Sequence, residues 1–105
     1  GEGTCIMAGA IINPDTNIGK NCVINTGAII EHDCKIGDNV QISPGTVISG
    51  GVTIGKDSFI GANSTIIQGV KIGQNTTIGA GTIVIKNLPD NCVAIGNPSR
   101  IIKYK

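Results

Sequence analysis

The stretch IGKNCV INTGAI IEHDCK IGDNVQ, residues 18–41, consists of four six-residue units that each begin with isoleucine. The spacing continues in both directions: isoleucine occupies every sixth position from residue 6 to residue 78, and Val84 follows in the same column. No insertion interrupts the units. Neither the 3.6-residue period of a helix nor the alternation of a simple strand produces this pattern, so the chain is a repeat protein.

Two further columns predict the shape of each unit. The fifth position is mostly small or β-branched, which suits the inside of a tight corner. The fourth position is always Gly, Asn or Asp, the residues that tolerate left-handed backbone torsions, so each unit is expected to turn there. The fourth-position residues are Gly9, Asp15, Asn21, Gly27, Asp33, Asn39, Gly45, Gly51, Asp57, Asn63, Gly69, Asn75, Gly81 and Asn87.

These columns predict an all-β triangular solenoid. One unit makes one short strand and one turn, and three units make an 18-residue coil whose strands pair with the next coil at a spacing of about 4.8 Å. The repeats correspond to about 4.7 coils at three units per coil. We expect this domain to cover residues 1–89, with a short closing segment over residues 90–105.

The composition narrows the class of protein. The 105 residues suit one domain. Eight basic and seven acidic residues leave a formal charge of +1, which argues against an electrostatic nucleic-acid binder. One Tyr, one Phe and no Trp leave the core to Ile, Val, Ala and other small residues. No run approaches the roughly 18 apolar residues of a membrane span, and no signal peptide opens the sequence.

The four cysteines are Cys5, Cys22, Cys34 and Cys92. There is no Cys-x-x-Cys pair and only one histidine, so a metal site within one chain is not expected. The cysteines are interpreted as small, buried, reduced thiols of a cytoplasmic protein.

The single histidine, His32, occupies the third position of its unit, a turn apex where packing makes no demand. Asp33 follows it; turn geometry alone explains Asp33, and a second role in orienting the imidazole is open. Three units after His32, the residue at the same position is Gly50. Its missing side chain leaves room for a ligand, and its bare amide could face an oxyanion. A solvated turn histidine is the alternative interpretation.

The third-position column that contains His32 and Gly50 continues along the chain. A tight turn explains why residue 51 is glycine, but it does not explain the glycine at residue 50. The next stacked apex is Gln68-Gly69, so a groove from His32 past Gly50 towards Gln68 could hold an extended ligand along the axis of the solenoid.

The sixth position of each unit is expected to point outward. One stacked column is apolar and would form an exposed stripe, which favours burial in a threefold oligomer. Ordinary β-propensity on a solvated sheet is the alternative. The residues of this apolar stripe are Ile11, Ile29, Val47, Thr65 and Ile83.

Units such as Ile18-Gly19-Lys20-Asn21 and Ile54-Gly55-Lys56-Asp57 resemble the hexapeptide-repeat acyltransferases. The resemblance implies a left-handed parallel β-helix and a homotrimer, although general crossover rules favour the opposite hand. Residues 24–34, with Ile42-Ser43-Pro44 and Gly50-Gly51-Val52, are similar to the sugar O- and N-acetyltransferases. These include sialic acid O-acetyltransferases and enzymes that N-acetylate nucleotide-linked 4-amino sugars.

This resemblance implies a set of roles. His32 would be the general base with Asp33 beside it, Asn25 would lie beside the acceptor sugar, and the Gly50 amide would face the thioester carbonyl. Acetyl-CoA would be the co-substrate, with no metal. Residues 94–102 resemble the closing segment near the nucleotide end of the coenzyme, where Lys86, Arg100 or Lys103 would meet its phosphates.

The sequence departs from the family's pattern in two places. Gln41 stands where many relatives have a second histidine. The relatives also have an N-terminal nucleotide-sugar-binding domain, and this chain begins almost at the first unit, so we interpret it as a truncated piece or as a relative that lost that domain.

We therefore predict an acyltransferase that moves an acetyl group from acetyl-CoA to an amine or hydroxyl of a sugar, first of all a nucleotide-linked amino sugar. The active sites would lie between subunits of a homotrimer. Three alternatives remain: a non-catalytic structural solenoid or inactive fragment, an O-acetyltransferase acting on serine or another small molecule, and a metal-dependent hydratase with three copies of His32 on the threefold axis.

Overall fold

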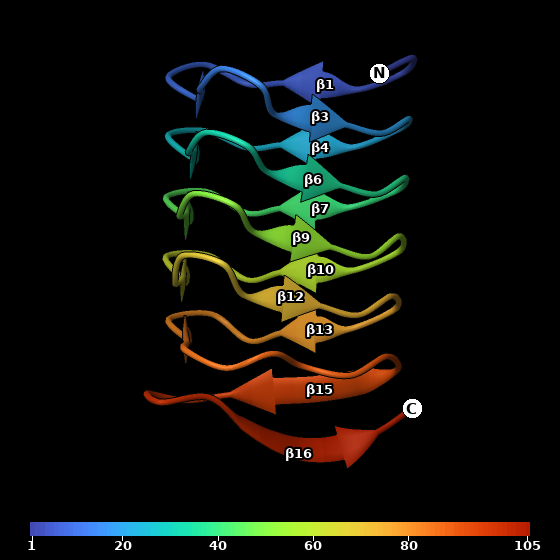
Figure 1. Cartoon of the computed structure of the whole chain (residues 1–105), viewed down its shortest axis with the longest axis vertical. Coiled ribbons are helices and arrows are strands. Elements are labelled where there is room, and N and C mark those ends of the chain that lie inside the picture. The colour runs from blue at the N-terminus through green and yellow to red at the C-terminus, as the bar shows by residue number, and fades with distance from the viewer.

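Each repeat unit forms one short strand and one turn. The computed structural model describes residues 1–105 and contains no helix (Figure 1). Every strand of the repeats ends on the isoleucine column or its valine equivalent, which confirms the predicted unit. The strands of the repeats are β1 (Cys5–Ile6), β2 (Ile11–Ile12), β3 (Asn17–Ile18), β4 (Val23–Ile24), β5 (Ile29–Ile30), β6 (Lys35–Ile36), β7 (Gln41–Ile42), β8 (Val47–Ile48), β9 (Thr53–Ile54), β10 (Phe59–Ile60), β11 (Thr65–Ile66), β12 (Lys71–Ile72), β13 (Thr77–Ile78) and β14 (Ile83–Val84).

Strands three units apart pair in parallel and form three sheets. The sheets run in the orders β1-β4-β7-β10-β13, β2-β5-β8-β11-β14 and β3-β6-β9-β12. Cα partners such as Ile11 and Ile29, or Ile30 and Ile48, occupy the same position of units that are one full coil apart. This confirms the triangular solenoid with three units in each coil.

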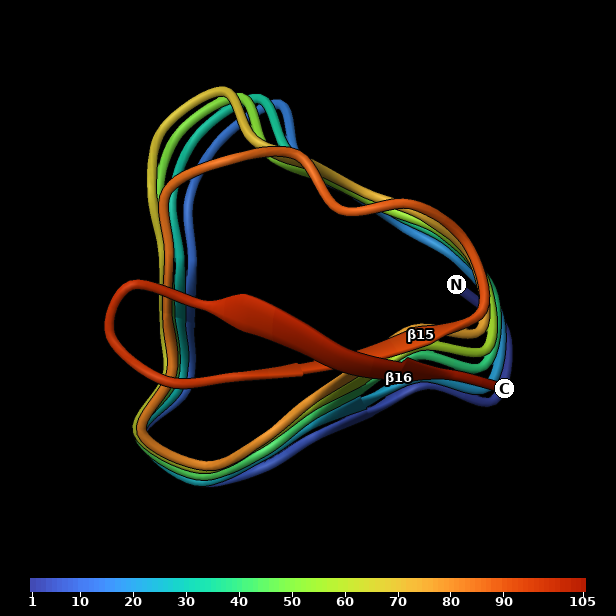
Figure 2. The ribbon, with the colours of Figure 1, turned by 90° about the horizontal axis from the view of Figure 1, so that it is seen from below.

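The hand of the solenoid is visible along its axis. Seen from the C-terminal end in Figure 2, the chain runs clockwise as it approaches the viewer, so the β-helix is left-handed. This agrees with the hand that the family resemblance implies and not with the general crossover rule. The molecule measures 31 × 21 × 20 Å along its principal axes.

The fourth-position residues adopt the left-handed torsions expected of them, with one exception. Asp33 has φ 59°, Asn63 has φ 57° and Gly51 has φ 68°, and the other members of the column from Gly9 to Gly81 have similar values. Asn87 is the exception: it is not among the residues with positive φ. The repeat spacing shortens at this point of the chain, because the next unit begins at Leu88, and Asn91, with φ 57°, is the left-handed fourth residue of that next unit.

The core consists of the isoleucine column and the fifth-position column. Ile24, Ile30, Ile42 and Ile60 are fully buried, as are fifth-position residues such as Cys34. At the N-terminal end the same isoleucine column is less covered, and Ile6 is 56% exposed. The fifth position faces inward, as predicted. Cys22, Cys34 and Cys92 are buried as predicted, but the prediction is wrong for Cys5, which is exposed because it stands in the outward sixth-position column.

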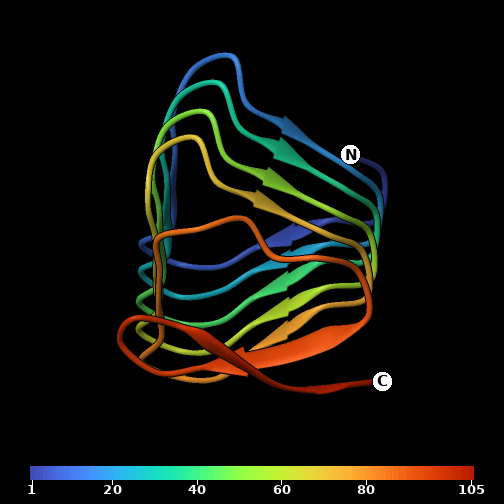
Figure 3. The same ribbon diagram turned by 60° about the horizontal axis from the view of Figure 1, so that its bottom comes forward.

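The last coil differs from the others. Leu88 bridges to Ile72, and β15 (Cys92–Ile95) pairs in parallel with β13 through Thr77 and Val93, so this coil is shorter than a full set of three units. The parallel pairing extends beyond the predicted boundary at residue 89 and into β15. Then β16 (Arg100–Tyr104) returns antiparallel to β15 and crosses the C-terminal end of the solenoid (Figure 3).

The apolar stripe lies on the outer surface of the β2-β5-β8-β11-β14 sheet. Ile11 is 52% exposed, and Ile29, Val47, Thr65 and Ile83 are half-buried. Two further apolar side chains, Ile67 and Ile85, directly follow strands of this sheet and are 40% and 49% exposed. No helix with the length and hydrophobicity needed to cross a bilayer is found.

The burial pattern predicts that two isoleucines of one column differ in their contribution to stability. We expect Ile60→Ala to lower the free energy of unfolding by about 2–5 kcal/mol, because it leaves a cavity in a fully buried column. Ile6→Ala is the matched control and should cost much less, because Ile6 is already 56% exposed. Urea denaturation measures both, and equal losses would contradict this account of the core.

Candidate active site

The turn between β5 and β6 carries His32 at its apex. The His32 side chain is 60% exposed and the Asp33 side chain is 63% exposed. Neither the torsions nor the packing of the turn require an imidazole at this position. The structure thus leaves the histidine free for contacts outside the core.

His32 and Asp33 contact each other through their side chains. His32 Nδ1 lies 2.9 Å from Asp33 Oδ2. A proton on Nδ1 would be donated to the carboxylate, and Nε2 would then present a lone pair on the opposite edge of the ring. Because the pair is exposed, it adds little to stability, and its main physical effect is to orient the ring. Asp33 therefore adopts the torsion of the turn and also contacts the imidazole.

Gly50 lies directly against the imidazole. A Cβ atom built on Gly50 would be 2.9 Å from both Cε1 and Nε2 of His32. The φ angle of Gly50 is not in the left-handed region, so backbone conformation does not demand glycine there, whereas Gly51 needs it at φ 68°. The stacking of successive coils therefore brings His32 and Gly50 together, as predicted. The prediction that the missing side chain leaves room for a ligand is wrong for the single chain, because the histidine ring fills that space.

Of the three glycine amides at this corner, only one is unpaired. The Gly51 N–H donates to His32 O at 3.0 Å, and the Gly69 N–H donates to Gly50 O at 3.0 Å, so both belong to the ladder that joins successive turns. The Gly50 N–H donates to no acceptor in the chain. Gly50, which is buried, is therefore the one of the three glycines whose N–H has no acceptor in the chain.

The remaining predicted site residues fall into two groups. We call the corner of the triangle that carries His32, between the β5 and β6 sheets, the His32 corner. Further along the axis this corner carries Gln68, Gly69 and Lys86. The exposed Ile67 directly precedes Gln68, and the exposed Ile85 directly precedes Lys86. Arg100 stands apart, on β16 opposite Ile95. The single chain has no pocket, so the groove expected from His32 past Gly50 towards Gln68 is not formed within one copy.

Asn25 is not near His32 within one chain. It begins the turn between β4 and β5, which is a different corner of the triangle, and its Oδ1 accepts the N–H of Thr26 at 2.8 Å. This bond gives Asn25 a local role in its own turn. A contact between Asn25 and the reacting groups would require a second copy of the chain.

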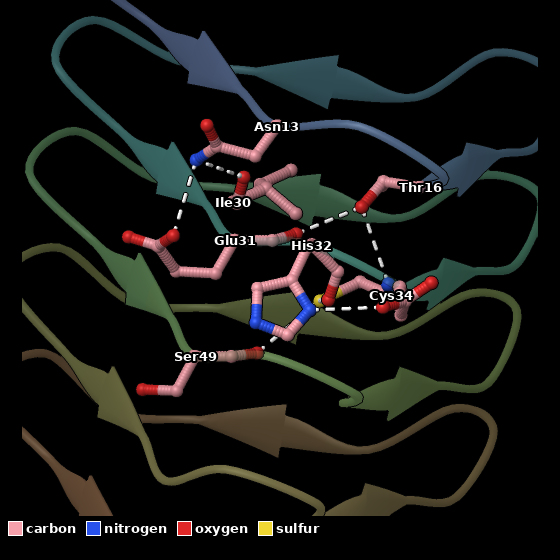
Figure 4. Close-up of polar contacts among 8 residues, drawn as sticks. Asn13, Thr16, Ile30, Glu31, His32, Cys34 and Ser49 are labelled. Carbon is pink, nitrogen blue, oxygen red and sulfur yellow. Dashed lines mark hydrogen bonds and ion pairs between the residues drawn. The ribbon is translucent and has the colours of Figure 1, made fainter.

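Sequence reasoning missed a set of polar contacts behind the histidine (Figure 4). Asn13 Nδ2 donates to Glu31 Oε2 at 3.2 Å, and Thr16 Oγ1 donates to the Glu31 carbonyl oxygen at 2.8 Å. The Cys34 thiol lies 3.2 Å from the Ser49 carbonyl oxygen. Each of these contacts joins one coil to the next. The 18-residue length of the coil could therefore have been used to predict them from the sequence.

Burial raises the pKa of the Cys34 thiol above its ordinary value, and the Glu31 carboxylate adds to the effect. The thiol therefore keeps its proton at neutral pH and acts as a donor. No group of three or more His, Cys, Asp or Glu side chains is arranged to hold a metal ion.

The chain matches two descriptions of hexapeptide-repeat proteins. Residues 15–50 match the bacterial transferase hexapeptide (six repeats) family, and residues 51–86 match the hexapeptide repeat of succinyl-transferase. Among curated protein sequences, none matches significantly.

Several solved structures of acetyltransferases superpose on the chain. A mutant of GDP-perosamine N-acetyltransferase from Caulobacter crescentus, in complex with CoA and GDP-perosamine, is 37% identical with a TM-score of 0.90, over 98% of this chain and 52% of that one. The acetyltransferase domain of PglB from Neisseria gonorrhoeae, in complex with acetyl coenzyme A, is 33% identical with a TM-score of 0.96, over 97% and 50%. WeeI from Acinetobacter baumannii is 30% identical with a TM-score of 0.79, over 95% and 55%. This chain thus spans about half the length of each.

The contact between Gly50 and His32 predicts different outcomes for two neighbouring alanine substitutions. Gly50→Ala should push the imidazole away from its position with little loss of stability, because the backbone torsion is ordinary and the colliding atoms belong to an exposed side chain. Gly51→Ala should lower the free energy of unfolding by about 1–2 kcal/mol through strain at positive φ. It should leave the ring in place.

Side-chain NMR signals of His32 and urea denaturation distinguish the two variants. An undisturbed imidazole signal in Gly50→Ala would show that the ring does not occupy the space above Gly50.

Proposed function

This chain belongs to the hexapeptide-repeat transferases, and we propose that it transfers the acetyl group of acetyl-CoA to the amine of a nucleotide-linked amino sugar. The observation that carries the proposal is the imidazole of His32, which contacts the Asp33 carboxylate and fills the side-chain space of Gly50, a residue whose N–H has no acceptor in the chain. The similar structures that hold CoA together with GDP-perosamine, or acetyl-CoA alone, support this choice of co-substrate and acceptor. A sugar hydroxyl is the second acceptor class.

His32 is proposed as the general base. The acceptor amine attacks the thioester carbonyl carbon while Nε2 of His32 takes a proton from the amine nitrogen. The carbon–sulfur bond then breaks, and the proton passes to the leaving thiolate of CoA. Histidine is the side chain that most often acts as a general base, and the Asp33 carboxylate holds the ring in the tautomer that leaves Nε2 free.

Gly50 is proposed as the donor to the oxyanion of the tetrahedral intermediate. Its N–H has no competing acceptor in the chain, and one oxyanion donor is generally worth about 2.7–4 kcal/mol of transition-state stabilisation. A Cβ on Gly50 would meet the His32 ring, so the residue proposed as the donor lies directly against the residue proposed as the base.

The rest of the corner offers a path for the coenzyme. Gly51 and Gly69 expose backbone without side chains, Gln68 adds a polar group, and the exposed Ile67 and Ile85 add apolar surface. Lys86 at the end of this path, and Arg100 on the closing strand, are the proposed partners of the CoA phosphates.

A homotrimer is proposed as the assembly, with its active sites between copies. The apolar stripe lies on the sheet that leads into the His32 corner, and a threefold arrangement would cover it. Such a contact would also bring the Asn25 turn of a second chain to the His32 corner, which has no Asn25 from its own chain. The buried free thiols Cys22, Cys34 and Cys92 fit a cytoplasmic protein.

The general-base assignment predicts a large loss of activity in His32→Ala. We expect acetyl transfer from acetyl-CoA to GDP-perosamine, measured by chromatography of the products, to fall by about 10²–10⁴-fold. Lys20→Ala is the matched control, because Lys20 is an exposed third-position residue at another corner. An undiminished rate in His32→Ala would exclude the proposed base.

The trimer predicts that a charge on the apolar stripe separates the copies. Val47→Glu places a carboxylate in the middle of the stripe, and we expect sedimentation velocity to show a shift from trimer to monomer. Thr53→Glu is the control, because Thr53 is an equally half-buried sixth-position residue on another sheet. A wild-type chain that sediments as a monomer would contradict the assembly.

A further inference from the structure

The inside of the His32 corner contains two hydrogen-bond donors. The fifth-position residues stacked there are Thr16, Cys34, Val52 and Val70, and only the first two carry a polar hydrogen. Thr16 Oγ1 donates to the Glu31 carbonyl oxygen at 2.8 Å, and the Cys34 thiol donates to the Ser49 carbonyl oxygen at 3.2 Å (Figure 4). A longer contact of 3.7 Å joins the thiol to the His32 carbonyl oxygen.

Both accepting carbonyls belong to peptides that carry the site. The Glu31 carbonyl is bonded to the nitrogen of His32, and the Ser49 carbonyl is bonded to the nitrogen of Gly50. The two donors are also linked to each other, since the Cys34 N–H donates to Thr16 Oγ1 at 3.2 Å. A chain of hydrogen bonds therefore runs behind the site through three successive coils.

Further along the corner the arrangement changes. Val52 has no polar hydrogen on its side chain, and the carbonyl equivalent to that of Ser49, which is the Ile67 carbonyl, accepts the Val70 backbone N–H at 3.3 Å instead. Side-chain donors at this corner therefore coincide with the two peptides that lead into His32 and Gly50.

We propose that Cys34 is a positioning residue for the acetyl transfer proposed above, acting through the Ser49–Gly50 peptide. Because a peptide is planar, a hydrogen bond that holds the Ser49 carbonyl also sets the direction of the Gly50 N–H on the opposite edge. Accepting that bond also polarises the peptide and makes its N–H a stronger donor. The inference rests on the proposed function, since Gly50 is the oxyanion donor in that reaction.

The thiol is suited to this role because it is fully buried and protonated. Desolvation favours its neutral form, so it remains a donor while His32 exchanges its proton. A thiol is a weak donor, so the effect on rate is modest and must be separated from the effect of packing.

Cys22 provides the matched control. It is as buried as Cys34, and its thiol donates to the Gly37 carbonyl oxygen at 3.1 Å, at a corner that carries no proposed site residue. Cys22→Val and Cys34→Val remove the same kind of bond and insert the same side chain, which the fifth-position column already tolerates at Val40 and Val52. Cys34→Ser keeps a buried donor.

The experiment measures kcat, the KM for acetyl-CoA and the Gly50 amide NMR signal in the wild type and the three variants. We expect Cys34→Val to lower kcat by about three- to tenfold with an unchanged KM, Cys34→Ser to restore kcat, and Cys22→Val to retain it. The Gly50 amide signal should move in Cys34→Val and return in Cys34→Ser.

Several results would overturn the inference. Equal losses of kcat in Cys22→Val and Cys34→Val would reduce the role of Cys34 to packing. An active wild type with full kcat in Cys34→Val, or an unmoved Gly50 signal in that variant, would overturn the inference about Cys34 alone. A wild type that transfers no acetyl group to GDP-perosamine or to other nucleotide-linked amino sugars would overturn the proposed function, and the inference with it.

Discussion

Backbone hydrogen bonds from each coil to the next hold this protein together, and they require the chain to return to the same corner after every third unit. The bonds between Ile11 N–H and Ala28 O, and between Ile29 N–H and Thr46 O, are two steps of one such ladder. A slip by a single position would turn the isoleucine column outward, so the coil length is specified at every turn. Every side chain consequently stacks on its equivalent three units later, and each column has one environment along most of the solenoid.

The candidate site is a consequence of this stacking. A turn histidine and a glycine with ordinary torsions each lack an explanation when considered alone. Their stacking accounts for the glycine, because the ring of His32 occupies the space that a side chain at Gly50 would need. Asp33 shows how one residue meets two demands: its backbone adopts the left-handed torsion of the turn, and its carboxylate contacts the imidazole. The site therefore needs no departure from the repeat.

The repeat ends in a different way at each end of the solenoid. At the N-terminal end the isoleucine column is only partly covered, as the exposure of Ile6 shows. At the C-terminal end the last coil is shortened, and β15 and β16 form an antiparallel pair. The Ser99 N–H donates to Ile83 O and the Ile83 N–H donates to Gly96 O, so the segment between these strands closes the end of the sheet that bears the apolar stripe. This closure also sets Arg100 apart from Lys86, which remains at the His32 corner.

The sequence alone determined the coil. Its six-residue period contains the strand positions, the turns, the inward columns and the stacking of Gly50 on His32, because in a solenoid contacts repeat at a constant separation. The tertiary structure decided what a period cannot express. Which glycine amide stays unpaired, where the thiol of Cys34 points and how the spacing shortens before Leu88 depend on side-chain orientations and on one irregular turn. The position of Asn25 at another corner, away from His32, likewise follows from the three-sided path of the backbone, which separates residues that are close in the chain.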